Sequence, residues 1–136
     1  MLKETIVSHD LDGNEITKDY YFNFFESEVA ELKYQYKDGI DKYVERMQQA
    51  NDVGEVIKVI KELILKAYGE RDPEDPSRFV KSEELREKFS QTEAYSNLFM
   101  KLGTDAKAAA EFIKGITPRQ LREETPNPIP LAKKGK

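Results

Sequence analysis

Histidine is the side chain that most often serves as acid or base near neutral pH, and this chain has one, His9. It has no cysteine, which excludes a thiolate nucleophile and disulfide bonds. A Ser-His-Asp site would depend on His9 alone, in a segment without the glycine pattern of a nucleophile elbow. Zinc likewise has no set of ligands. We therefore predict that His9 is a surface residue and that the protein is not an enzyme.

The segment Asp10–Asn14, DLDGN, is the next place where side chains could do chemistry, because it resembles the start of a calcium-binding loop. Such a loop has glycine at its sixth position and glutamate at its twelfth. Here Gly13 is fourth and Tyr21 is twelfth, so a turn is favoured, and we predict neither a metal nor a cofactor. The other carboxylates lie mostly on expected solvent faces, which leaves a small carboxylate-based hydrolase as a distant alternative.

The charge of the chain is uneven. The net charge is −4, but the last twenty residues carry five lysines and arginines against two glutamates, which leaves −7 on residues 1–116. An acidic body is a poor surface for nucleic acid. No apolar run is long enough to span a bilayer, and residues 1–15 lack the apolar centre of a secretory signal. We expect a soluble, cytoplasmic protein that binds neither nucleic acid nor a membrane.

The N-terminal region predicts a β-hairpin. A strand over residues 5–9 and a return strand over residues 15–24 flank Asp12-Gly13, a strong signal for a two-residue type I′ turn. This register places one apolar face against the rest of the protein. The residues expected on that face are Val7, Leu11, Ile16 and Tyr20. The aromatic run of residues 20–25 has acidic neighbours, so we interpret it as core, with a fraction exposed as a binding patch.

Helical periodicity begins near Glu26 and predicts helices over residues 26–36 and 40–50. The first carries the stripe Val29, Leu32 and Tyr36, and the second carries Tyr43, Val44 and Met47. Residues 53–68 are the most apolar stretch, so we expect a central helix there, or one that meets a partner on its second face. Gly69 is expected to end it, and residues 70–78 to form a loop.

The residues after this loop predict three short helices. Ser82 is expected to cap one helix, and Ser90 with Glu93 to form a capping box for the next. Two caps so close together indicate two helices that meet at an angle. Gly103 is expected to stop the second helix, and Thr104-Asp105 to cap the last, which runs to Gly115.

These elements predict a mainly α fold with a small N-terminal β-hairpin (α+β), a compact bundle of about five or six short helices. Residues 1–116 are predicted to form a single globular domain, with the hairpin in 1–25 and the helices in 26–116. Residues 117–136 hold four prolines and are predicted to be a flexible, basic tail.

The order of these parts resembles the tail assembly chaperones of long-tailed, siphovirus-type phages and prophages of Gram-positive bacteria. The segments that carry the resemblance are DLDGNEITKDYYFNF, ESEVAELK, LILKAYGE and, most specifically, the block from Phe79 to Ile116, FVKSEELREKFSQTEAYSNLFMKLGTDAKAAAEFIKGI. The resemblance covers about residues 1–116. These are packing and capping residues and not a catalytic signature.

The resemblance implies a non-catalytic protein of the host bacterial cytoplasm, absent from the mature virion. It implies binding to the tape measure protein, which is kept soluble until the tail tube polymerises. It also implies a longer form, made by a programmed −1 frameshift, that recruits the tail tube protein. Ala132-Lys133-Lys134 fits a slippery heptamer, A AAA AAG, so Lys133 and Lys134 mark the candidate frameshift region. Self-association is also expected, because family members often form homo-oligomers and residues 53–68 are very apolar for a small domain.

The residues proposed to meet a partner are Tyr95, Phe99 and Phe112. Short capped helices that present these rings would form a groove for a client helix, although the same rings are equally compatible with a core position. The alternative function is another phage structural, connector or adaptor protein that is retained in the virion.

Overall fold

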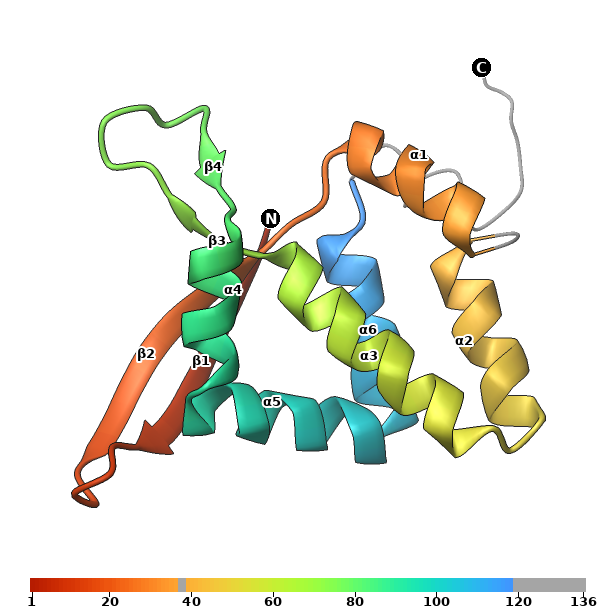
Figure 1. Ribbon diagram of the computed structural model, residues 1–136, viewed down its shortest axis with the longest axis horizontal. Coiled ribbons are helices and arrows are strands. Elements are labelled where there is room, and N and C mark those ends of the chain that lie inside the picture. The colour runs from red at the N-terminus through yellow and green to blue at the C-terminus, as the bar shows by residue number, and fades with distance from the viewer. Residues whose placement is uncertain (37–38, 119–136) are drawn as a thin grey trace.

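The structure, a computed structural model, describes residues 1–36 and 39–118 (Figure 1). The secondary structure of these ranges confirms the predicted fold class, mainly helical with a small N-terminal β-hairpin. The strands are β1 (Leu2–His9), β2 (Glu15–Phe22), β3 (Tyr68–Arg71) and β4 (Phe79–Val80). The helices are α1 (Glu26–Gln35), α2 (Ile40–Gln49), α3 (Val53–Ala67), α4 (Glu83–Ser90), α5 (Glu93–Thr104) and α6 (Ala106–Ile116). Most of the predicted tail, including Lys133 and Lys134, lies outside the described residues.

The turn between β1 and β2 is longer than predicted. The Gly13 amide donates to the Asp10 carbonyl oxygen at 3.1 Å, and Gly13 has a φ of +86°, which favours glycine. The Asp10 carboxylate accepts hydrogen bonds from the amides of Asp12 and Asn14, both at 2.9 Å. This is a three-residue loop with a left-handed glycine at its end. The predicted type I′ turn is wrong, because it requires positive φ at Asp12 as well.

The longer loop shifts the strand pairing by one residue, which exchanges the two faces of β1. Ile6 is buried, whereas Val7 is 51% exposed and Leu11 is fully exposed. The predicted inward face is therefore wrong for β1. On β2 it is right for Tyr20, which is buried, while Ile16 is 38% exposed near the tip of the hairpin.

Two short strands, β3 and β4, extend the hairpin into a four-stranded sheet in the order β1-β2-β3-β4. The prediction of a loop over residues 70–78 missed them, because both are very short. Gly69 does not end α3 as a left-handed cap; Tyr68 already has extended geometry. Gly69 lies in β3, where an added Cβ would come within 2.6 Å of the Phe79 ring and 2.7 Å of the Val80 carbonyl oxygen. Its small size allows β3 to approach β4.

The first three helices lie where the periodicity predicts them. The side chains of Val44 and Met47, predicted on the apolar stripe of α2, are outside the described part of the structure. Helix α3 is central, as predicted, and begins at Asp52, whose carboxylate accepts a hydrogen bond from the Glu55 amide at 3.3 Å. Its buried residues are Val56, Val59, Ile60, Leu63, Ile64 and Ala67.

The corner between α4 and α5 is built by two caps. Ser82 Oγ accepts from the Leu85 amide at 3.1 Å, which confirms the first predicted cap. The capping box predicted at Ser90 is wrong, because α4 continues through Ser90 and its hydroxyl donates to a carbonyl oxygen inside α4 at 2.8 Å. Thr92 caps α5 instead and accepts from the Tyr95 amide at 3.2 Å. Two helices do meet at an angle here (Figure 1).

The junction between α5 and α6 confirms one prediction and corrects two. Asp105 caps α6, as predicted, and accepts from two amides of its first turn. Gly103 lies inside α5, which continues to Thr104, so it is not the stop signal. Gly115 likewise lies inside α6, where an added Cβ would come within 2.8 Å of the Leu2 side chain. Gly115 thus allows α6 to pack against β1.

Aromatic rings from four elements meet at the centre of the core. Phe89 of α4 stacks on Tyr68 of β3, with ring centroids 4.2 Å apart and planes at 14°. Phe22 of β2 contacts Phe112 of α6 edge-on at 5.3 Å. The aromatic run therefore belongs mainly to the core, as interpreted, although Phe25 is 52% exposed.

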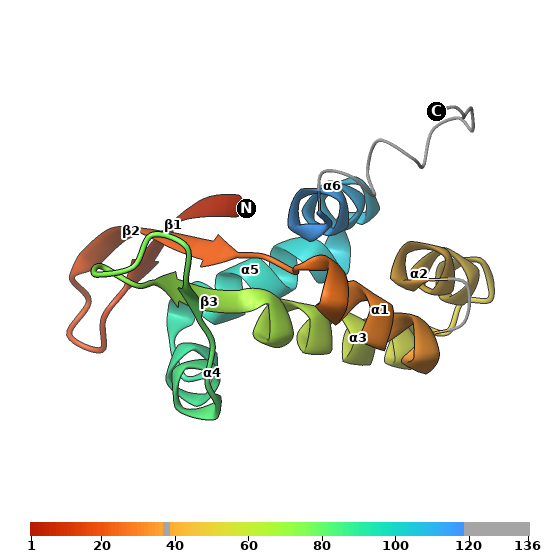
Figure 2. The ribbon, with the colours of Figure 1, turned by 90° about the horizontal axis from the view of Figure 1, so that it is seen from above.

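Figures 1 and 2 place the β1–β2 hairpin and the α1–α2 pair at opposite ends of the molecule. Helix α3 runs between the two ends, with α6 beside it. Helices α1 and α2 lie together at one end of the molecule (Figure 1), where both contact α3 through hydrogen bonds.

Candidate functional site

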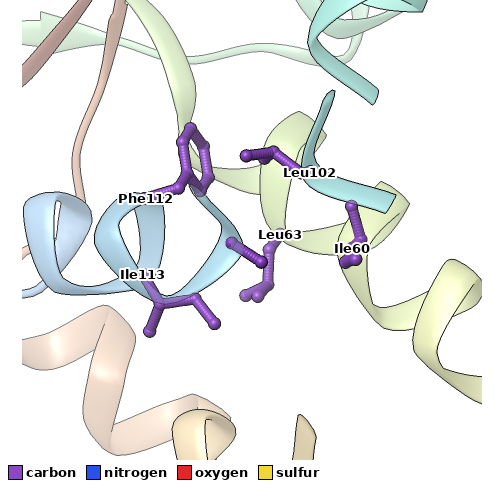
Figure 3. A pocket seen from close by; sticks show the side chains of 6 residues that line it. Ile60, Leu63, Leu102, Phe112 and Ile113 are labelled. Atoms are coloured by element: carbon purple, nitrogen blue, oxygen red, sulfur yellow. The ribbon is translucent and has the colours of Figure 1, made fainter. Parts of the chain in front are cut away.

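An apolar pocket lies between α3, α5 and α6 (Figure 3). The residues that line it are Ile60 and Leu63 of α3, Leu102 of α5, and Ala109, Phe112 and Ile113 of α6. Every one of these side chains is apolar, and in Figure 3 the faint ribbon of α1 and α2 passes on the side to which Ile113 points. The space has room for little more than one water molecule, and five of its six lining residues are buried, so it is a small gap in the core without an acid, base or nucleophile.

The three predicted partner-binding residues do not form one groove. Tyr95 and Phe99, both half-buried, lie together on α5 with ring centroids 6.0 Å apart. Tyr95 also contacts Phe89 edge-on at 5.6 Å. Phe112 is 3% exposed and packs on Phe22, so it faces the core and one wall of the pocket.

Helices α1 and α2 form a unit that we call the arm, residues 26–36 and 39–49. Every side chain of α1 is described, and within this helix only Leu32 is buried. Val29 is half-buried, and Tyr36, which ends the helix, is buried. Leu32 and Tyr36 belong to the same cluster of buried side chains as Ile60 of the pocket. The apolar stripe of α1 thus packs on the same core as the pocket wall.

Polar contacts, which we call the clasp, also tie the arm to α3. The Tyr36 hydroxyl donates to Glu62 Oε1, and the side-chain amide Nε2 of Gln35 donates to Glu62 Oε2 at 3.0 Å. The Tyr43 hydroxyl donates to Glu55 Oε2 at 2.7 Å. The two tyrosine rings lie against each other, with centroids 4.9 Å apart. Glu55 and Glu62 are two turns apart, so both carboxylates face the arm from one side of α3.

The clasp shifts the ionisation of its members. Burial, together with the hydrogen bond and negative charge of Glu62, raises the pKa of Tyr36 far above its usual range. Burial acts to raise the pKa of Glu62, but hydrogen bonds from Tyr36, Gln35 and Lys66 outweigh it and lower that pKa. The hydrogen bond to Glu55 raises the pKa of Tyr43. The contacts therefore favour protonated tyrosines and an ionised Glu62.

The base of the arm is fixed by a different set of contacts. The Phe24 amide donates to the Ile116 carbonyl oxygen at 3.0 Å. Glu28 accepts from the Phe25 amide at 2.8 Å and pairs with Lys81 at 2.6 Å. The Lys81 ammonium also lies 4.8 Å from the centre of the Phe24 ring. Burial lowers the pKa of Lys81, although the Glu28 carboxylate opposes that effect. These contacts hold the start of α1 on the core.

The sequence matches a known protein family over most of its length. The family model described as phage tail assembly chaperone matches residues 1–130. The chain belongs to the phage tail assembly chaperone family. The match extends 14 residues beyond the resemblance placed on residues 1–116. Neither a curated protein nor a solved structure gives a match to this chaperone.

The polar residues considered for chemistry have structural contacts in the chaperone. His9 lies on the surface, as predicted, and both its amide and its Nδ1 contact Glu93 Oε1, at 2.8 and 3.0 Å. These contacts join β1 to α5. Across residues 1–36 and 39–118, no group of three or more histidines and carboxylates is placed to hold a metal ion. In the same ranges, no helix has the length and apolar character needed to cross a membrane.

The sequence analysis missed the acidic half of the clasp. Tyr36 and Tyr43 stand out as aromatic residues on the predicted stripes, but Glu55 and Glu62 look like ordinary solvent-facing residues of α3. The only sequence signal is the seven-residue spacing of Glu55 and Glu62, which places both on one side of α3. Tyr36 ends α1 and Tyr43 lies in α2. That spacing does not identify a partner helix.

Proposed function

We propose that this tail assembly chaperone binds the tape measure protein and keeps it soluble until tail tube subunits polymerise around it. The observation that supports this proposal is the match of residues 1–130 to the phage tail assembly chaperone family, on a chain with net charge −4. A long helical client needs reversible cover for apolar side chains and no bond chemistry. Tyr95 and Phe99, half-buried on α5, offer a partly exposed aromatic surface to such a client, whereas Phe112 is buried in the core.

The proposal includes the setting in which the chaperone acts. The block from Phe79 to Ile116, with its resemblance to proteins of siphovirus-type phages and prophages, supports a Gram-positive host. The chaperone then works in the host cytoplasm without catalysing a reaction, and it leaves before the virion is complete. Mass spectrometry of purified virions checks this last point: stoichiometric amounts of the chain in mature tails would favour the alternative, a connector or adaptor protein.

A longer form of the chaperone is a further part of the proposal. In it, a −1 frameshift near Lys133 and Lys134 adds a segment that recruits the tail tube protein. The nucleotide sequence of codons 132–134 tests the site directly, because a frameshift there requires a slippery heptamer. Self-association through apolar surface is also proposed, and analytical ultracentrifugation of the purified chain measures it.

The main experiment is co-expression with the tape measure protein of the same phage or prophage. We expect the tape measure protein to stay in the soluble fraction with the chaperone and to aggregate without it. An unrelated acidic protein of similar size, expressed at the same level, is the control for a general effect on solubility. Equal solubility of the tape measure protein in all three strains would refute the proposed function.

A further inference from the structure

The arm occupies a surface of α3 that is built to receive a helix. Val29, Leu32 and Tyr36 lie at positions i, i+3 and i+7 and form one stripe on α1 and its C-terminal cap. Leu32 and Tyr36 are buried members of the same core cluster as Ile60 and Leu63, and Tyr36 contacts α3 directly through Glu62. The surface beneath the arm thus accepts apolar groups spaced as on one face of an amphipathic helix.

The two carboxylates on this surface, Glu55 and Glu62, accept hydrogen bonds from uncharged groups of the arm. Glu62 accepts from the Tyr36 hydroxyl and the Gln35 amide, and Glu55 accepts from the Tyr43 hydroxyl. The bonds to Glu62 are already charge-assisted, because that carboxylate is ionised, and Glu62 also pairs with Lys66 of α3 at 3.1 Å. A helix with lysine or arginine opposite Glu55 and Glu62 would add direct attraction between opposite charges, whereas the Tyr36, Gln35 and Tyr43 donors are neutral.

The arm is also attached in a way that allows it to leave. Its start is fixed on the core through Phe24 and the Glu28–Lys81 pair, whereas the rest of α1 buries only Leu32 within the helix. Its far end joins α3 through an exposed turn at Asn51, a non-glycine residue with a φ of +59°. Release of the clasp would thus free both helices of the arm while the chain on either side stays in place.

From these contacts we propose that the arm is a displaceable cover, and that an amphipathic helix of the client, with lysine or arginine opposite Glu55 and Glu62, takes its place on α3. This inference rests on the proposed function, since the client is the tape measure protein. It adds the location of the binding surface and the chemistry of the client segment. The arm hides an apolar surface in the free chaperone, and the client exchanges with it reversibly.

The first test locks the arm in place. Because the chain has no cysteine, Gln35→Cys with Glu62→Cys provides two unique thiols that a short bismaleimide can join across the clasp. Tyr43→Cys with Glu55→Cys repeats the lock at its other contact, in case one pair does not fold. Glu84→Cys with Lys88→Cys, an exposed pair within α4, carries the same linker away from the arm and is the matched control. Circular dichroism verifies that each protein is folded.

Each purified protein is mixed with unfolded tape measure protein on dilution from urea, and the soluble fraction is measured. Each unlinked variant lacks one of the two carboxylates, so we expect it to keep only part of the wild-type ability, and we expect the linked control to keep all of it. Each arm-linked protein is expected to lose most of what its own unlinked form retains. If the arm-linked proteins act as well as the unlinked ones, the displacement inference is overturned and the chaperone function stands. If the wild-type chain itself fails, the proposed function and this inference fall together. If the bismaleimide joins two copies of the chain instead of two thiols within one copy, the inference is also overturned, because the arm of one copy would then pack on α3 of another.

The second test separates the cover from the charged surface, using labelled peptides that tile the tape measure protein. Tyr36→Phe weakens the cover and is expected to raise peptide affinity by up to about fivefold, because more of the chaperone is open. Glu62→Gln also weakens the clasp but removes the charge that a basic segment needs, so affinity is expected to fall. Tyr34→Phe, at a 95% exposed site on α1, should change nothing. Equal effects of Tyr36→Phe and Glu62→Gln would overturn the charge complementarity.

Discussion

The Tyr43 hydroxyl donates a 2.7 Å hydrogen bond to Glu55 Oε2, and this contact joins α2 to the first turn of α3. The chain reverses direction between Tyr43 and Glu55, so this bond holds α2 against α3, the helix that follows it. Together with the Tyr36–Glu62 contact it makes the position of the arm depend on two tyrosine hydroxyls and two carboxylates. The stability and the ionisation of the arm can therefore be changed without altering the aromatic core.

Tyr36→Phe removes one hydroxyl of the clasp and keeps the ring. We expect the free energy of unfolding to fall by about 1 kcal/mol, the usual net value of one hydrogen bond. Backbone amides of residues 26–36 and 39–49 should exchange with solvent faster, while those of α5 should not. Hydrogen exchange with mass spectrometry measures both regions, and Tyr34→Phe is the control. Faster exchange in α5 to the same extent would mean that the arm does not open separately.

The contribution of the clasp should depend on pH in a defined window. Glu62 has a lowered pKa in the folded chain, so its contribution is present above its ordinary value of 4.5 and is lost as the pH falls through the folded value. Tyr36 has a raised pKa, so its contribution is present below its ordinary value of 10.0 and is lost as the pH rises through the folded value. The difference in unfolding free energy between wild type and Tyr36→Phe, from urea titrations, should be largest near neutral pH. A difference that stays unchanged down to the lowest pH at which the chain remains folded would contradict the ionised Glu62 partner.

Phe112→Ala tests whether this ring is mainly part of the core. Removal of a buried phenylalanine typically costs about 3–5 kcal/mol, and Phe112 is 3% exposed. Met100→Ala, on the neighbouring helix α5 and 56% exposed, should change the free energy of unfolding by no more than about 0.5 kcal/mol. Urea denaturation compares the two variants. Similar small losses in both would show that Phe112 is more accessible than this packing implies.

Gly69→Ala tests the close approach of β3 to β4. The added methyl group would meet the Phe79 ring and the Val80 carbonyl oxygen at less than 3 Å, so we expect a loss of about 1–3 kcal/mol. Gly54→Ala is the matched control, because nothing lies within 4 Å of its added Cβ in α3. That variant should gain about 0.5–1 kcal/mol, since alanine favours a helix. Thermal unfolding of both variants gives the signs, and a stabilised Gly69→Ala protein would rule out the steric contact.

Local signals in the sequence predicted local structure well. The caps at Ser82 and Asp105 and the periodicity of α1 to α3 depend on residues a few positions apart, and the structure has these features where they were predicted. The cap at Ser90 was misplaced by two residues because Thr92 offers the same chemistry. Cap residues alone do not decide between two hydroxyls so close together.

Features that depend on distant partners could not be predicted. The inward face of β1 was wrong because one extra loop residue at Asp10–Asn14 reverses it, and no local pattern specifies that count. The sequence around Gly69 predicts a helix stop. Its role in the close approach to β4 has no local signal, because β4 begins ten residues later in the sequence. The clasp joins residues 26 positions apart, Tyr36 and Glu62, and neither carries a sequence signal for the other.

The most direct measurement is hydrogen exchange of the chaperone alone and bound to the tape measure protein. We predict that amides of the arm, residues 26–36 and 39–49, exchange faster in the complex. We also predict that amides of α3 around Ile60–Ile64 stay protected or become more so, because a client helix replaces the arm. Stronger protection of the arm together with α3 would contradict it, since the client would then bind over a closed arm.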